Sequence, residues 1–200
     1  MNSDTRVVKE LFCRLFVIAI RNKTNLSSFT YLLERSVFLP KIEENTYDEY
    51  FNKPLEDIFF DITNDHIEED DSYGIYDDAY WAGASYFELF LETKKPFSYI
   101  FLKLPLVKMM DIYPIYHEMP FSSLVEYFHK LEKEKTIIRA LCEQNKYSLT
   151  KLSDLTGINK ATLSSYNASD EALYKGSFQN IISIASSLKA PTNLFIQKIL

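Results

Sequence analysis

A single glycine between two short apolar patterns is the feature that most constrains this fold. Gly157 separates the segment Leu149–Leu155 from the segment Lys160–Tyr166, and each segment carries apolar residues at three-residue intervals. This spacing places the apolar side chains on one face of a helix. Because glycine readily adopts the positive φ of a tight turn, the pattern predicts two short helices joined at Gly157.

Both predicted helices begin at a residue that can cap them. The side-chain oxygens of Ser148 and Asn159 can accept hydrogen bonds from the N–H groups of the first helical turn. Ile158 is expected to fill the angle between the helices. Ser153 is small, so the second helix can pass close over the first. The sequence therefore predicts a compact helical pair with a defined crossing point.

Two further helices are expected to complete this part of the chain. The run Ile137–Cys142 predicts a helix before the pair, and Phe178–Leu188 predicts a longer one after it, ended by the segment that contains Pro191. The segment that contains Asp170 and Glu171 is expected to be a loop. The last helix presents apolar residues that can cover the pair.

This arrangement resembles the lambda repressor/Cro-like family of helix-turn-helix domains, also called the Xre type, most strongly over Leu152–Leu163. In that family the second helix of the pair enters the major groove of DNA, while the first turn of the other helix touches phosphate. The resemblance implies base-edge contacts from Lys160, Ala161 and Ser165, backbone or secondary contacts from Asn159 and Thr162, and phosphate contacts from Thr150, Lys151 and Lys175.

The first two-thirds of the chain also carry helix-type apolar spacing. Helices are expected over Asp4–Arg21, from Asn25 or Leu26 to a stop at Pro40, after Pro54, over Asp78–Lys95, from Pro105 to a stop at Pro114, and after a capping box of Ser123 and Glu126. We therefore expect an all-α fold. A helical N-terminal body over residues 1–135 would precede a helix-turn-helix domain over residues 136–200.

Charge is distributed unevenly between these two parts. Residues 1–135 carry 24 acidic and 15 basic side chains, whereas residues 136–200 carry 4 acidic and 7 basic ones. Only the cationic part is suited to approach a polyanion. The acidic side chains are concentrated between Asp61 and Asp78, with a run at Glu68–Asp71. This segment is interpreted either as a solvated loop or as a surface that binds a basic partner or mimics nucleic-acid phosphates.

Motifs of catalysis, metal binding and export are missing from the sequence. Cys13 and Cys142 are isolated, and His117-Glu118 lacks the second histidine of a zinc-protease motif. The 4 glycines form no phosphate-binding pattern. The apolar run Leu11–Ile20 is shorter than a membrane span and contains Arg14. We expect a cytoplasmic protein that is not an enzyme and uses no cofactor, metal or membrane.

These features lead us to expect a transcriptional regulator that binds double-stranded DNA as a homodimer. A single domain of this kind buries roughly 600–1,000 Å² on DNA, and a weakly cationic one would bind poorly alone. The alternative is an acidic protein-binding inhibitor, such as an antitoxin or an anti-defence protein. In that case the N-terminal body would engage a basic partner, and the helix-turn-helix would serve for docking or autoregulation.

Overall fold

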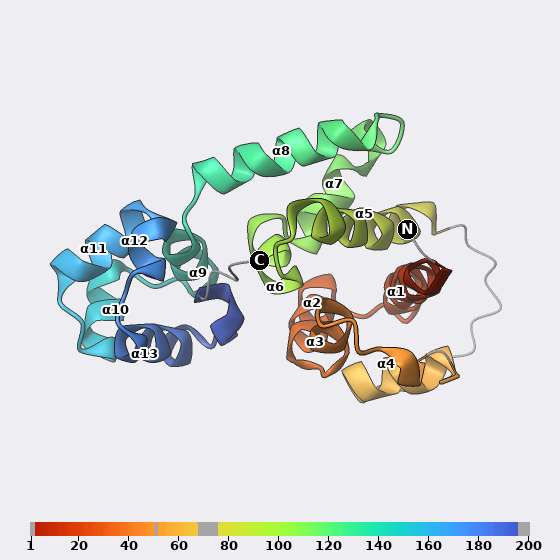
Figure 1. Ribbon diagram of the computed structural model, residues 1–200, viewed down its shortest axis with the longest axis horizontal. Coiled ribbons are helices and arrows are strands. Elements are labelled where there is room, and N and C mark those ends of the chain that lie inside the picture. The colour runs from red at the N-terminus through yellow and green to blue at the C-terminus, as the bar shows by residue number, and fades with distance from the viewer. Residues whose placement is uncertain (1–2, 51, 68–75, 196–200) are drawn as a thin grey trace. The chain divides into compact units, whose positions relative to one another are not determined.

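All regular secondary structure is helical in the computed structural model, which describes residues 3–50, 52–67 and 76–195 (Figure 1). The predicted all-α class is therefore confirmed for these ranges. The chain divides into two compact units, Met1–Val125 and Glu126–Leu200. The division lies within a helix, before the boundary at residue 135 expected from the sequence. Within the described ranges, no helix has both the length and the apolar character needed to cross a membrane.

The N-terminal unit is built from helices of very different lengths. They are α1 (Ser3–Arg21), α2 (Leu26–Arg35), α3 (Phe38–Glu43), the 3-10 turn η1 (Asp48–Tyr50), α4 (Leu55–Thr63), α5 (Asp77–Thr93), α6 (Phe97–Lys103), α7 (Leu106–Tyr116) and the start of α8 (Phe121–Glu134). The side chain of Asn25 caps α2 by accepting from the backbone N–H of Ser28, and Pro54 is the N-cap of α4. Both starts agree with the sequence-based prediction.

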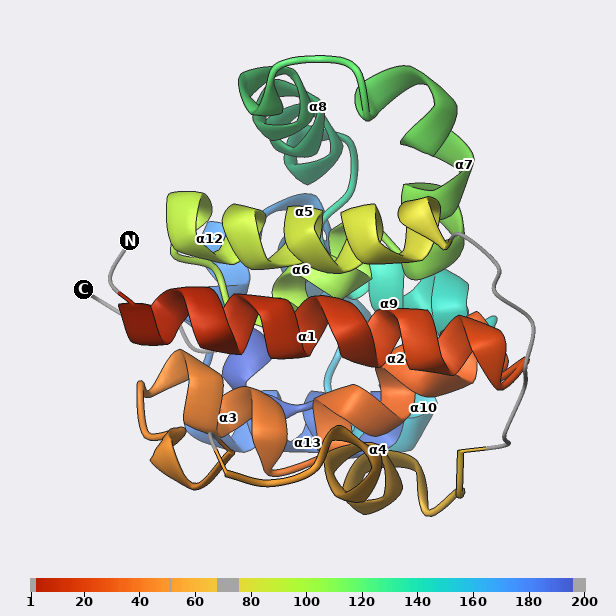
Figure 2. The same cartoon turned by 90° about the vertical axis from the view of Figure 1, so that its right-hand side faces the viewer.

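The two longest helices of this unit, α1 and α5, run antiparallel and lie side by side (Figure 2). They approach closely at Gly83 of α5, where an added Cβ atom would lie 2.8 Å from the Cα atom of Cys13 and 3.3 Å from the ring of Phe16. Only a residue without a side chain fits this crossing. Ion pairing between Lys9 and Glu88 joins the same two helices at their surface.

An aromatic core fills the space beside this crossing. The ring of Phe12 lies 4.9 Å from that of Phe97 and 5.8 Å from that of Phe87, measured between centroids. Each such buried ring contributes about 1.5–3 kcal/mol to stability through the apolar area removed from water. The hydroxyl of Tyr86, fully buried here, donates a hydrogen bond to the carbonyl oxygen of Leu104 at 2.7 Å. Its polar group is thus satisfied inside the core.

Two prolines that were expected to stop helices lie within helices instead. The second helix ends at Arg35, and Pro40 lies in the first turn of the separate helix α3. A proline is tolerated there because the first N–H groups of a helix have no intrahelical partner. Pro114 lies within α7, which continues to Tyr116 before it ends.

The expected capping box of Ser123 and Glu126 is also wrong, because α8 begins at Phe121. The backbone N–H of Ser123 already donates to the carbonyl oxygen of Pro120, so Ser123 lies within the first helical turn. Proline fixes φ close to the helical value, which allows the helix to begin directly after it.

The C-terminal unit contains the predicted helical pair and its neighbours. Its elements are the remainder of α8, α9 (Ile137–Asn145), α10 (Leu149–Thr156), α11 (Lys160–Ala168), α12 (Asp170–Tyr174), α13 (Phe178–Leu188) and the 3-10 turn η2 (Thr192–Phe195). The predicted helices at the positions of α9, α10, α11 and α13 are confirmed. The expected loop before α13 instead contains α12, which is capped by Ser169 and buries Leu173.

Replacing Gly83 with alanine should destabilise the N-terminal unit. Glycine to alanine would by itself favour a helix by about 1 kcal/mol. The new Cβ atom would meet the backbone of α1, however, and such overpacking typically costs about 1–3 kcal/mol. We expect Gly83→Ala to lower the midpoint of thermal unfolding followed by circular dichroism. Glu92→Ala, at an exposed position of α5, is the control and should leave it nearly unchanged. An unchanged or raised midpoint for Gly83→Ala would contradict the close crossing.

Glu34 of α2 is half-buried, and the fold removes much of the water around its carboxyl group. Burial raises the pKa of Glu34 to about 8, although the neighbouring Arg35 acts in the opposite direction. In the unfolded chain the pKa returns to its ordinary value of 4.5. Between these two pH values the folded protein therefore binds a proton that the unfolded chain releases. Stability supplied by this group is fully present below pH 4.5 and is lost as the pH rises through 8.

Glu34→Gln should remove this pH dependence. The amide carries no charge, so the variant should be more stable than the wild type at pH 9, with little difference at pH 4; each unit of pKa shift corresponds to about 1.4 kcal/mol. Urea unfolding across this pH range measures the effect. Glu92→Gln, on the exposed side of α5, should retain the wild-type slope. A slope that persists in Glu34→Gln would assign the pH dependence to other groups.

Candidate nucleic-acid interface

The turn between α10 and α11 is held by three local interactions. Gly157 has φ 71°, and its N–H closes α10 on the carbonyl oxygen of Ser153. The hydroxyl of Ser153 donates to the carbonyl oxygen of Ile158 at 2.6 Å, and the hydroxyl oxygen of Thr156 accepts from the N–H of Ile158 at 3.2 Å. Ile158 itself is buried. These contacts set the direction in which α11 leaves the turn.

The caps predicted for the two helices are both present. The Ser148 hydroxyl oxygen accepts from the N–H of Lys151 at 3.1 Å, at the start of α10. At the start of α11, the side-chain oxygen of Asn159 accepts from the N–H of Thr162 at 2.8 Å. Asn159 therefore serves as a cap through its side-chain oxygen, and the NH₂ group of the same amide carries two donors.

One face of α11 is buried and the other is open. Leu163 and Tyr166 are buried, whereas the base-contact candidates Lys160, Ala161 and Ser165 are exposed. Thr162 is half-buried. The exposed face also includes Ser164, which the sequence-based interpretation missed.

Ser164 is exposed on α11 and lies four residues after Lys160 and three after Ala161. Side chains at these separations lie on the same helix face. The helical periodicity alone could have identified Ser164, because both buried positions of α11 lie on the opposite side of the helix. The open face of α11 thus carries one cation, two hydroxyl groups and the methyl groups of Ala161 and Ala168.

The expected phosphate contacts occupy two other places. Thr150 and Lys151 are exposed in the first turn of α10, and Lys175 is exposed directly after α12. Among the described residues, Lys151, Lys160 and Lys175 make no ion pair. The charges of these three lysines are therefore available to a partner.

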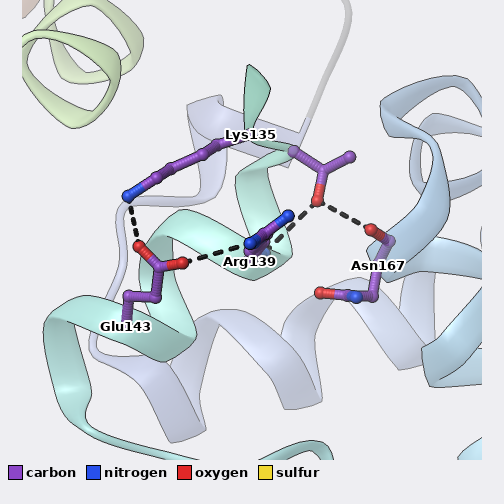
Figure 3. Close-up of polar contacts among 5 residues, drawn as sticks. Lys135, Arg139, Glu143 and Asn167 are labelled. Atoms are coloured by element: carbon purple, nitrogen blue, oxygen red, sulfur yellow. Dashed lines mark hydrogen bonds and ion pairs between the residues drawn. The ribbon is translucent and has the colours of Figure 1, made fainter. Parts of the chain in front are cut away.

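The start of α9 is joined to the end of α11 (Figure 3) and also to α12. The hydroxyl of Thr136 donates to the carbonyl oxygen of Asn167 at 2.9 Å and accepts from the N–H of Arg139 at 3.3 Å. A carboxylate oxygen of Asp170 accepts from the N–H of Ile137 at 2.7 Å. A negative charge at this position is favoured by the unpaired N–H groups of the helix start.

Two cations share one carboxylate on the surface of α9. Lys135 and Arg139 both contact Glu143, with 3.3 Å between the Arg139 Nε and the Glu143 carboxylate (Figure 3). The hydrogen bond from Lys135 holds the pKa of Glu143 below its ordinary value, and Arg139 acts in the same direction. These two cations are therefore partly neutralised, in contrast to the lysines of α10 and α11.

Metal ligation and thiol chemistry find no support in the described ranges. No cluster of three or more His, Cys, Asp or Glu side chains could hold a metal ion there. Burial raises the pKa of Cys13 to about 12 and also raises that of Cys142, so both thiols are protonated near neutral pH. The acidic run Glu68–Asp71, on which the expected protein-binding surface depends, lies outside the described residues.

The turn should be sensitive to the residue at position 157. An alanine there would be forced into a left-handed conformation, at a cost of about 1 kcal/mol, although no neighbouring atom would clash with its Cβ. We expect Gly157→Ala to lower the unfolding midpoint of the C-terminal unit, and Gly157→Asn to lower it less, since asparagine tolerates this conformation. Hydrogen exchange of the amides in α10 and α11 measures the loss of stability in both variants. Equal protection in all three proteins would contradict the positive φ.

Comparisons with known proteins give no assignment for this chain. No protein-family model, no curated protein and no solved structure matches it. The residues and the geometry of the C-terminal unit are therefore the basis for a functional proposal. The exposed face of α11, with the capped start of α10 preceding it in the chain, is the candidate site that these provide.

Proposed function

We propose that the C-terminal unit binds double-stranded DNA and that the protein acts as a transcriptional regulator of the lambda repressor/Cro-like kind. In this proposal α11 enters the major groove and the start of α10 contacts the sugar-phosphate backbone. The observation that carries it is the open face of α11, where Lys160 makes no ion pair among the described residues and the apolar side chains are buried on the opposite face.

The side chains on this face suit the edges of base pairs. A lysine donates to the O6 and N7 acceptors of guanine, a methyl group such as that of Ala161 contacts the thymine methyl, and a serine hydroxyl can donate or accept. Ser164 and Ser165 add two such hydroxyl groups. Short side chains also allow the helix backbone to lie deep in the groove. The proposal predicts base contacts from few residues and a large contribution from the DNA backbone.

Backbone contacts would come from α10 and from the segment after α12. The Ser148 cap already occupies the N–H of Lys151, but the positive end of the α10 helix dipole still favours an anion. Thr150 and Lys151 add a hydroxyl and a cation at the same helix end. Lys175 supplies a further cation. Each neutralised phosphate releases counterions, so binding should weaken steeply as salt is raised.

We also propose that two copies bind together. The C-terminal part of the chain has only a small excess of cations, 7 basic against 4 acidic side chains over residues 136–200. One such unit buries roughly 600–1,000 Å² on DNA, and pairing two units on adjacent half-sites doubles the contact. The acidic remainder of the chain would repel DNA and so leave contact to the C-terminal units.

Lys160→Ala is the direct test of this function. If Lys160 contacts a base, the variant should bind a selected duplex more weakly by about 1–3 kcal/mol, a factor of roughly 5–150. The duplex would be selected from a pool of random-sequence DNA by the wild-type chain, and affinity measured by fluorescence anisotropy at two salt concentrations. Lys133→Ala, which removes an exposed lysine of α8, is the matched control and should bind like the wild type.

Failure of the wild-type chain to bind any duplex at about 50 mM salt would contradict the proposed function, because electrostatic binding is strongest under these conditions. Equal losses in Lys160→Ala and Lys133→Ala would show a general charge effect. In that case α11 would not be the groove-binding helix.

A further inference from the structure

The connection between α8 and α9 is short. Helix α8 ends at Glu134 and α9 begins at Ile137, which leaves only Lys135 and Thr136 between them. Thr136 has φ −74° and ψ 165°, an extended conformation that interrupts the helix. The segment 130–140 contains no glycine or proline. The break in the helix is therefore maintained by contacts rather than by a residue that forbids a helix.

Two of these contacts reach the end of α11 and the start of α12. Thr136 donates to the carbonyl oxygen of Asn167, in the last turn of α11, while it also caps α9 (Figure 3). Asp170, the first residue of α12, accepts from the N–H of Ile137. These two hydrogen bonds thus join the start of α9 to residues more than thirty positions later in the sequence.

We propose that Thr136 and Asp170 are positioning residues that hold the C-terminal end of α11 against the start of α9. The peptide that joins α8 to α9 then also fixes the orientation of α11. If the helix ran without a break from α8 into α9, Thr136 would lose its extended conformation and its bond to Asn167. The end of α11 would be released, so the break couples the path of α8 to the placement of α11.

The consequence for DNA binding rests on the proposed function, whereas the coupling itself does not. A groove-binding helix must be held in one orientation to present its side chains to the bases. Release of its C-terminal end would lower affinity without removing any residue that touches DNA. The two residues would therefore act through α11 and not by direct contact.

Hydrogen exchange in the full chain tests the coupling without DNA. Thr136→Val is nearly isosteric but removes both hydrogen bonds, and Asp170→Ala removes the second contact. We expect exchange of the amides at 167–169 to become about fivefold faster in each, the factor that corresponds to loss of a typical helix cap. Asp170→Asn keeps an acceptor oxygen, so its exchange should remain close to that of the wild type.

Ser177→Ala is the matched control for a lost helix cap. The hydroxyl oxygen of Ser177 accepts from the N–H of Asn180 at 3.3 Å and caps α13, so its removal weakens the same unit at another helix start. Exchange at 167–169 should be unaffected in this variant. Unchanged exchange in Thr136→Val and Asp170→Ala, or equally fast exchange in Ser177→Ala, would overturn the proposed coupling.

Affinity for the selected duplex provides the second readout. Thr136→Val should bind about fivefold more weakly than the wild type, whereas Ser177→Ala, with a comparable loss of stability, should bind normally. An equal loss of affinity in both variants would show that Thr136 contributes only to the stability of the unit. If the wild-type chain binds no duplex, the proposed function fails, and the exchange measurement alone still decides whether Thr136 and Asp170 position α11.

Discussion

The left-handed backbone of Gly157 is the constraint on which the candidate interface depends. It ends α10 and turns the chain, and the hydroxyls of Ser153 and Thr156 then hold Ile158 in place. Because Ile158 is buried and Asn159 caps the next helix, α11 has little freedom to rotate about its own axis. Its Leu163 side is buried and its Lys160 side faces outward as a direct result.

Contacts at the far end of α11 complete this placement. The turn at Gly157 determines where the helix begins, and Thr136 with Asp170 determines where its last turn lies. A short helix held at both ends by side-chain hydrogen bonds can present a fixed set of groups to a partner. Asp170 has its carboxylate at the start of α9, so its charge offsets the partial positive charge of a helix end.

The N-terminal unit obeys a different constraint, the close crossing of α1 and α5 at Gly83. Aromatic rings such as Phe12 and Phe97 pack beside this crossing. Burial also leaves Glu34 with a pKa of about 8, which makes this unit the part of the protein where a carboxyl group opposes folding at high pH. Neither feature contributes to the candidate interface, and both concern the stability of the body.

The sequence by itself determined the all-α class, the helices on either side of Gly157 and their caps at Ser148 and Asn159, because periodicity and capping are properties of neighbouring residues. It did not determine that Pro40 lies inside a helix or that α12 occupies an expected loop. Only the tertiary structure decided the contacts of Thr136 with Asn167 and of Asp170 with Ile137, and the approach of Gly83 to Cys13. These join residues that are far apart in the chain, and no local pattern records which distant backbone groups will meet when the helices pack.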